Sequence, residues 1–167
     1  MKVYPLLSHY ARKKKIDYFI RAIPKDCRIL EIGCGDGWVR DYLFDEGFSG
    51  YVGLDIKPPA DIVGDISNWQ ALGIKENSFD VIIAFEVVEH VDCFRHCYKI
   101  LKPGGKLMVT TPVPAMDLFL MFLEAMGFSQ KRTSPHANLV NLDKIDYFRG
   151  KNIKIIGFLS QWAVFTK

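Results

Sequence analysis

The sequence predicts a doubly wound α/β fold, in which helices cover both faces of a mostly parallel β-sheet. Dense apolar segments recur at residues 29–32, 78–86 and 107–111, as expected for strands buried on both faces. Helical segments separate them, as the connections between parallel strands require. The first apolar segment also ends in alternating glycines, where a strand turns directly into a helix.

The glycine-rich turn lies in residues 29–37, ILEIGCGDG. Glycine lacks a Cβ atom, so the backbone there can approach a ligand closely and adopt dihedrals that other residues avoid. A helix is predicted from Trp38 to about Glu46, with Gly47 at its C-terminal end. The dinucleotide fingerprint G-x-G-x-x-G/A fits poorly, because the third glycine comes one position early and the bulky Trp38 follows it.

The second predicted strand, residues 52–56, carries Asp55 at its C-terminal end, 20 residues after Gly35. In a doubly wound sheet, a carboxylate at this place can accept hydrogen bonds from both hydroxyls of a ribose. The alternative is a solvent-exposed turn residue ahead of Pro58-Pro59. A short third strand over residues 60–64 ends in Asp65-Ile66.

The last predicted elements follow the turn at 101–106, LKPGGK, and the buried strand at 107–111. Asn141 is expected to cap a helix over 142–148 that Gly150 ends. Residues 153–159 and 162–165 are predicted to form two strands, antiparallel because the connection between them is short.

Five motifs in unbroken order along residues 25–112 resemble the class I S-adenosylmethionine-dependent methyltransferases: ILEIGCGDG, LDI, GDI, SFDVIIAFEVVEHV and LKPGGKLMVTTP. The sequence is most similar to the small-molecule branch, whose members often carry E-V-x-E-H after the fourth strand. The resemblance implies a Rossmann-like, seven-stranded sheet with a C-terminal antiparallel strand. It also implies methyl transfer to a small, partly apolar acceptor, with S-adenosylhomocysteine as the product.

The resemblance implies a cofactor site in the loops after the first four strands, with these residues: Glu31, Gly33, Gly35, Gly37, Asp55, Ile56, Asp65, Ile66, Phe85 and Glu86. In such a site the glycines pass beside the methionine portion, anchored by Glu31. Asp55 binds the ribose, and Asp65 accepts a hydrogen bond from the adenine amino group. The two isoleucines press on the adenine, and the backbone of Phe85 and Glu86 borders the methionine end.

A base is needed only where the methylated atom starts out protonated, because the methyl group of a sulfonium is already activated. The candidates are Glu89, His90 and His136, which the resemblance places near the acceptor. For His90, the alternative is a structural role at the start of its helix.

Potential metal ligands cluster on one predicted helix: His90, Cys93, His96 and Cys97. A single helix cannot surround a zinc ion, and no C-x-x-C pair exists elsewhere, so we predict buried thiols, a surface His96 and no metal. Cys27 and Cys34 are expected to be packed thiols in a reducing compartment.

Composition predicts one soluble domain over residues 1–167, with an N-terminal helix in 1–24 and a lid-like insertion at 113–137. A net charge of +3 argues against nucleic acid as a partner. No apolar run reaches the roughly 20 residues that span a bilayer, and no signal peptide is recognisable, so a cytoplasmic location is expected.

Two segments allow more than one interpretation. The basic run at 12–15 is expected to be the solvated end of an amphipathic helix, and the alternative is a phosphate-contacting patch for RNA. A helix over 117–128, DLFLMFLEAMGF, would be apolar nearly all round. It fits core or homodimer packing, a lid over an apolar substrate, or a peripheral membrane anchor.

Two other functions are compatible with the same motifs. One is methylation of RNA or protein, although Phe85-Glu86-Val87-Val88 stands where base-methylating members carry Asn/Asp-Pro-Pro-aromatic. The other is a catalytically inactive subunit that binds S-adenosylmethionine and serves a partner.

Overall fold

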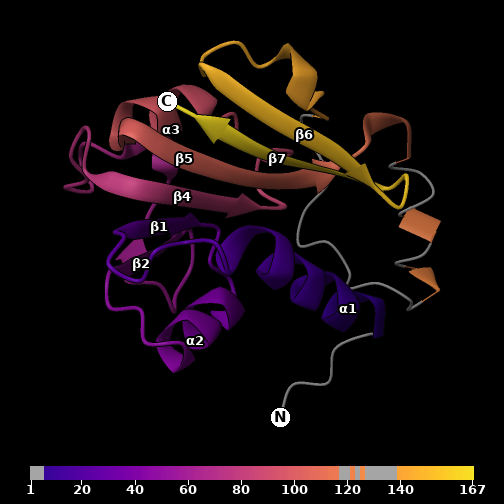
Figure 1. Ribbon diagram of the computed structural model, residues 1–167, viewed down its shortest axis with the longest axis horizontal. Coiled ribbons are helices and arrows are strands. Elements are labelled where there is room, and N and C mark those ends of the chain that lie inside the picture. The colour runs from indigo at the N-terminus through magenta and orange to yellow at the C-terminus, as the bar shows by residue number, and fades with distance from the viewer. Residues whose placement is uncertain (1–5, 117–120, 123–124, 127–138) are drawn as a thin grey trace.

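The computed structural model describes residues 6–116, 121–122, 125–126 and 139–167. They form a seven-stranded sheet with the strand order β3-β2-β1-β4-β5-β7-β6. The strands are β1 (Ile29–Ile32), β2 (Tyr51–Asp55), β3 (Ile62–Val63), β4 (Phe79–Phe85), β5 (Leu101–Pro112), β6 (Gly150–Ile156) and β7 (Ser160–Thr166). In Figure 1, β4, β5, β7 and β6 follow one another from the middle to the top of the view, with α1 and α2 below.

The first five strands are parallel, and β7 runs antiparallel to both β5 and β6. The register places Glu31 of β1 beside Gly53 of β2 and Ile83 of β4. The strand order therefore reverses between β1 and β4, and ligands of doubly wound sheets bind outside the carboxyl ends of the strands at such a point. This topology confirms the predicted fold class.

The helical elements are α1 (Leu6–Lys15), α2 (Trp38–Asp45), α3 (Phe94–Ile100), the π-helical turn η1 (Ile16–Ile20), and the 3-10 turns η2 (Ile66–Asn68), η3 (Pro114–Met116) and η4 (Leu142–Lys144). Both faces of the sheet are covered. Ile29 packs in a cluster with residues of η1 and α2, whereas the adjacent Leu30 packs in a second cluster with residues of α3. Strands with buried residues on both faces explain the dense apolar runs in the sequence.

The helix after the glycine turn has the predicted bounds: α2 ends at Asp45, and Gly47 follows with φ +83°. The third helix begins later than predicted. Val87 O accepts hydrogen bonds from the N–H groups of His90 and Val91, which closes a separate turn, and α3 starts only at Phe94. The prediction that His90 and Cys93 lie on one helix with His96 and Cys97 is therefore wrong.

The helix predicted over 142–148 is only the single turn η4. Asn141 caps it as expected, because its side chain accepts a hydrogen bond from Asp143 N at 3.1 Å. The turn is not continued, because the backbone is already extended at Ile145, with ψ 111°. Arg149 N then donates to Thr166 O at 3.0 Å, and β6 begins at Gly150. The final antiparallel pair is confirmed, with β6 starting earlier than predicted.

The N-terminal helix is also shorter than predicted. The α-helical part ends at Lys15, and a π-helical turn follows, in which Arg21 N donates to Ile16 O at 3.1 Å. Most of the segment 117–128, much of the insertion 113–137, and His136 lie outside the described residues. Within the described part of the chain, no helix has the length and apolar character needed to cross a membrane.

Candidate functional site

The loop between β1 and α2 lies over the carboxyl end of β2. Gly33 N and Cys34 N both donate to Leu54 O, at 2.8 and 3.2 Å. Gly33, Gly35 and Gly37 all have positive φ values, of +72°, +50° and +78°. Three left-handed residues within five positions favour glycine at each of them.

The glycines differ in what surrounds them. A Cβ atom on Gly33 would lie 2.5 Å from Cγ2 of Val87, so Gly33 is required for packing against the loop after β4. A Cβ atom on Gly35 would meet only Gly33 O, at 3.9 Å. The space beside Gly35 is therefore free of the protein's own atoms, and the backbone there is open to a ligand.

Asp55 lies directly beside this open backbone. Its Oδ2 atom accepts a hydrogen bond from Gly35 N at 2.9 Å, and its Oδ1 atom accepts one from Lys57 N at 3.1 Å. The side chain of Ile56, the next residue, is exposed. The structure thus brings the acid at the end of β2 and the glycine loop into one group, as their spacing predicted.

Asp65 follows β3 near the same edge of the sheet. Gly64 N donates to Asp55 O at 2.9 Å, which holds the end of β3 against the end of β2. The exposed Asp65 carboxylate caps η2 by accepting a hydrogen bond from Ser67 N at 2.8 Å. The side chain of Ile66 is buried in the core cluster, so it is packed against the protein's own residues.

Glu31 lies beneath the glycine loop with its side chain 3% exposed. Tyr51 OH donates a hydrogen bond of 2.6 Å to Glu31 Oε2. Burial disfavours the ionised carboxylate and raises the pKa of Glu31 to about 8, although the hydrogen bond from Tyr51 partly opposes this. Glu31 therefore links β1 to β2 in the interior.

The end of β4 forms the other side of the site. The ring of Phe85 stacks on Trp38 with centroids 6.1 Å apart. Glu86 follows with φ +56°, a left-handed backbone that is uncommon outside glycine. Its N–H donates to Thr110 O, and its Oε1 atom accepts hydrogen bonds of 2.8 Å from both Thr110 Oγ1 and Lys15 Nζ.

Two cations of α1 pair with acids of these two loops. Arg12 Nη2 lies 2.9 Å from Oδ2 of Asp36 in the glycine loop, and Lys15 Nζ lies 2.8 Å from Glu86 Oε1. The expectation that the basic run is solvated is therefore wrong for Arg12 and Lys15. It holds for Lys13 and Lys14, which are exposed.

Arg12 and Lys15 are the functional candidates that sequence reasoning missed. Residues three apart lie on the same face of a helix, and that spacing was the available signal. Nothing in the sequence, however, indicates that this face turns toward Asp36 and Glu86, since those contacts join residues 24 and 71 positions apart.

Glu89 lies in the turn after β4 and is 1% exposed. Thr111 Oγ1 donates to its Oε2 atom at 3.0 Å. Burial, followed by the negative charge of Glu86, raises the pKa of Glu89 to about 8, while the charge of Lys15 opposes the shift. His90 is half-buried in the same turn. The ends of β4 and β5 therefore carry a group of acids, hydroxyls and one ammonium.

The two thiols at the start of α3 and within it are buried as predicted: Cys93 and Cys97 are fully buried, and a hydrogen bond between them contributes to raising the pKa of Cys97. Within the described ranges, no group of three or more His, Cys, Asp or Glu side chains is arranged to hold a metal ion.

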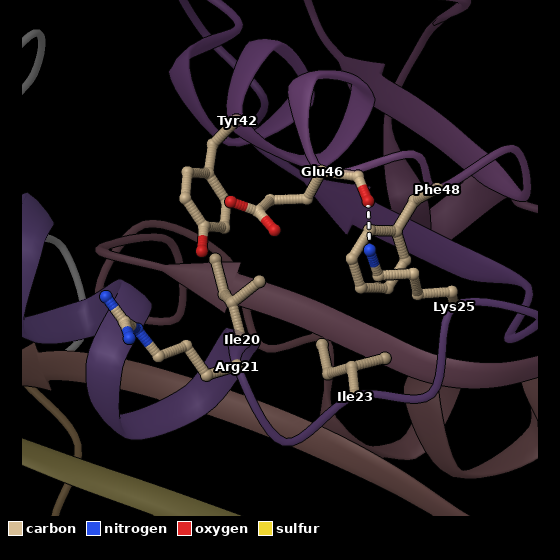
Figure 2. A pocket seen from close by; sticks show the side chains of 7 residues that line it. All are labelled: Ile20, Arg21, Ile23, Lys25, Tyr42, Glu46 and Phe48. Carbon is tan, nitrogen blue, oxygen red and sulfur yellow. Dashed lines mark hydrogen bonds between the residues drawn. The ribbon is translucent and has the colours of Figure 1, made fainter.

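A separate pocket of about 280 Å³ lies at the opposite end of α2 (Figure 2). It is lined by Ile20, Arg21, Ile23, Lys25, Tyr42, Glu46 and Phe48. Lys25 Nζ donates to the backbone oxygen of Glu46 across it. None of its lining residues belongs to the glycine loop or to the carboxyl ends of β2, β3 and β4, so the pocket is distinct from the candidate site.

The chain is similar to known methyltransferases. The sequence model of a family described as "Methyltransferase domain" matches residues 7–155. The mitochondrial ubiquinone biosynthesis O-methyltransferase of Mus musculus is 32% identical over 146 residues, covering 71% of this chain and 39% of that protein. A probable S-adenosylmethionine-dependent methyltransferase of Mycolicibacterium smegmatis is 31% identical over 99 residues, covering 50% and 37%. The matched part therefore covers less than half of either relative.

The fold has a solved counterpart in the PH0226 protein from Pyrococcus horikoshii OT3. Its crystal structure superposes with a TM-score of 0.69 at 18% identity and covers 95% of this chain and 90% of that chain. At this identity, the similarity supports the seven-stranded architecture alone.

Proposed function

Since this chain belongs to the class I S-adenosylmethionine-dependent methyltransferase domain family, we propose that it transfers a methyl group from that cofactor to a small, partly apolar acceptor. The observation that carries this proposal is the pairing of Gly35 and Asp55. Open backbone and a carboxylate meet at the point where the strand order reverses, the place where a nucleoside binds in doubly wound sheets.

The residues present fit the cofactor. Asp55 binds the two ribose hydroxyls, for which its two oxygens are held in place by Gly35 N and Lys57 N. Gly33, Gly35 and Gly37 let the main chain pass beside the methionine portion. The exposed Ile56 covers the adenine, and Asp65 accepts a hydrogen bond from its amino group. Ile66, being buried, supports that loop from below.

The methionine end lies toward β4. The backbone of Phe85 and Glu86 borders it, and the carboxylates of Asp36 and Glu86 are both held by cations of α1. The aromatic pair of Trp38 and Phe85 limits access of water there. Glu31 acts only by positioning the glycine loop above it, because its side chain is buried and hydrogen-bonded to Tyr51.

When bound, the cofactor supplies a methyl group already activated on a positive sulfur. The chain contributes alignment, which can lower the barrier by up to about 7–11 kcal/mol, and exclusion of water. Methyl transfer would form a bond between the acceptor and the methyl carbon, and the electron pair of the broken carbon–sulfur bond would remain on the sulfur of the product. For a protonated oxygen acceptor, we assign the departing proton to the Glu89 carboxylate, with His90 as the second candidate in the same turn.

The acceptor class is inferred from the relatives. The Mus musculus protein carries the description of a ubiquinone biosynthesis O-methyltransferase, which favours an oxygen of a small molecule as the methylated atom. No described contact favours a nucleic acid, because two of the four cations in the basic run are paired within the chain. We therefore retain the small-molecule acceptor.

The test combines cofactor binding with methyl transfer. Isothermal titration with S-adenosylmethionine should show one saturable site, and incubation with methyl-labelled cofactor and fractionated extract should label the small-molecule fraction. Label in the RNA or protein fraction would shift the assignment to a macromolecular acceptor. Binding without label in any fraction would favour an inactive partner subunit.

A further inference from the structure

We propose that the β6–β7 turn is a contact site for a lipid bilayer that carries anionic headgroups, with Phe158 entering the interface between headgroups and acyl chains. This inference goes beyond the proposed methyl transfer and does not depend on it, because it concerns the exposed side chains of the β6–β7 turn and not the glycine loop or Asp55.

Phe158 contacts little of its own chain. Its side chain is 82% exposed, the highest value among the large exposed hydrophobic residues described. Phe158 and the preceding Gly157 both have positive φ, +61° and +57°, and Leu159 N donates to Ile156 O at 3.2 Å. A turn with positive φ at both central residues favours asparagine or glycine at those two positions.

A bulky aromatic residue with left-handed backbone is strained. Phe158 therefore adds strain to the turn without burying its ring in the protein. Because strained, exposed residues persist where function requires them, the turn is better explained by an external contact than by folding.

Other apolar side chains surround the turn. Ile155 and Ile156 precede it on β6, and both are exposed. Val113 N donates to Leu159 O at 2.9 Å, so the chain that leaves β5 starts directly beside the turn. Further along that segment, the described Met121, Phe122 and Met126 are also exposed. Figure 1 shows residues 121–122 and 125–126 at the same end of the molecule's long axis as the β6–β7 turn.

The charge of this region suits an anionic surface. Lys154 is the cation of β6 nearest the turn, whereas Lys151, further from the turn on the same strand, is paired with Asp146 at 2.8 Å. Lys154 lies two residues before Ile156 and is exposed along β6, with its Nζ atom 4.9 Å from the Tyr18 ring. Cations beside apolar side chains add electrostatic attraction to anionic lipids.

A second copy of the chain fits this surface less well. β6 is the edge strand of the sheet, and unpaired edges can add a strand from another molecule. The exposed Lys154 opposes such pairing, because a lysine on an edge strand hinders the addition of another strand.

The test measures co-sedimentation of the protein with vesicles of phosphatidylcholine alone and of phosphatidylcholine mixed with phosphatidylglycerol. The wild-type protein should bind the mixed vesicles, and Phe158→Gly should reduce the partition coefficient about tenfold. Because glycine suits the positive φ, Phe158→Gly should have a melting temperature no lower than that of the wild type, which separates lost contact from lost folding.

Phe44→Ala is the matched control, since Phe44 is an exposed aromatic residue on α2, away from the turn. It should leave the partition coefficient unchanged. The proposal is overturned if the wild-type protein does not bind the anionic vesicles, or if Phe158→Gly binds them as well as the wild type does. It is equally overturned if analytical ultracentrifugation shows that the wild-type protein is a dimer and that Phe158→Gly is a monomer. Titration with S-adenosylmethionine, run on the same variants, reports the cofactor site separately.

Discussion

Lys15, the last residue of α1, forms an ion pair of 2.8 Å with Glu86, the first residue after β4. Thr110 of β5 donates to the same carboxylate oxygen. Lys15 is only 8% exposed, although it belongs to a run of four consecutive cations. The contact fixes the N-terminal helix across the carboxyl ends of β4 and β5, so α1 is part of the candidate site.

Replacing Lys15 by methionine should lower the free energy of unfolding by about 1–2 kcal/mol. The value lies between those of exposed and buried pairs, because the Glu86 side chain is 43% exposed and regains part of its solvation. Urea denaturation of Lys15→Met, Glu86→Gln and the double variant would measure the coupling. If the two single effects simply add, the pair contributes nothing specific.

Replacing Asp55 by alanine should weaken S-adenosylmethionine binding at least tenfold. Hydrogen bonds to a charged acceptor contribute about 1.5–3 kcal/mol, and the change also releases Gly35 N from its partner. Isothermal titration measures the affinity. Asp45→Ala, at the exposed end of α2, is the control and should bind as the wild type does. Equal affinity in both variants would remove Asp55 from the site.

Adding a methyl group at Gly35 should abolish cofactor binding in a protein that still folds. The new Cβ atom meets only Gly33 O at 3.9 Å, so it occupies the space proposed for the ligand. Gly35→Val extends the same obstruction. Because φ is +50°, some strain is expected, about 1 kcal/mol.

Gly73→Ala provides the matched control for Gly35→Ala. Gly73 has φ +77°, and no heavy atom lies within 4 Å of the position that a Cβ atom would take there, so the variant carries similar strain away from the site. It should show a similar loss of melting temperature and unchanged cofactor affinity. Binding by Gly35→Ala would contradict the close approach of backbone to ligand.

The sheet and the glycine loop could be predicted from the sequence, because their signals are local. Continuous apolar runs predict parallel strands that are buried on both faces, as the sheet has them. Gly47 follows the end of α2, as expected for a glycine at a helix C-terminus. The spacing between Gly35 and Asp55 indicated where the candidate site lies, because two parallel neighbouring strands bring their carboxyl ends together.

Contacts between distant segments could not be predicted. Arg12 and Lys15 appear as surface charges until the path of α1 is known, and the acids that they meet belong to other loops. The same holds for Asn141, whose predicted capping contact is present. The helix is nevertheless only one turn long, and β7 contacts both sides of it, because Gln161 Oε1 accepts from Leu142 N and Thr166 O accepts from Arg149 N. Tertiary hydrogen bonds outweigh local helix propensity there.

Stability should depend on pH through Glu31. Its pKa rises from 4.5 in the unfolded chain to about 8 in the fold, so the stabilisation is fully present below about pH 4.5. It is lost as pH rises toward 8, because the unfolded chain ionises first. In Glu31→Gln, which cannot ionise, that loss should disappear. Melting temperatures of both proteins at about pH 5 and pH 9 check this, and parallel curves would contradict the buried, raised pKa.

Cofactor binding should release a proton from Glu89. Its pKa of about 8 in the free protein leaves it mostly protonated near neutral pH. The groups that face it are Glu86 in its own loop, Thr111 on β5 and Lys15 on α1. A sulfonium bound beside Glu86 adds a positive charge, which lowers the pKa of Glu89 and readies the carboxylate to accept the acceptor's proton.

Isothermal titration at about pH 7 in two buffers of different ionisation enthalpy measures this release. S-adenosylmethionine should release a larger fraction of a proton than S-adenosylhomocysteine, because the sulfur of the latter is neutral. Glu89→Gln should bind both ligands and abolish the difference. Equal proton release by the two ligands in the wild type would show that the charge on sulfur does not act on Glu89. His90 would then be the remaining described candidate for the base.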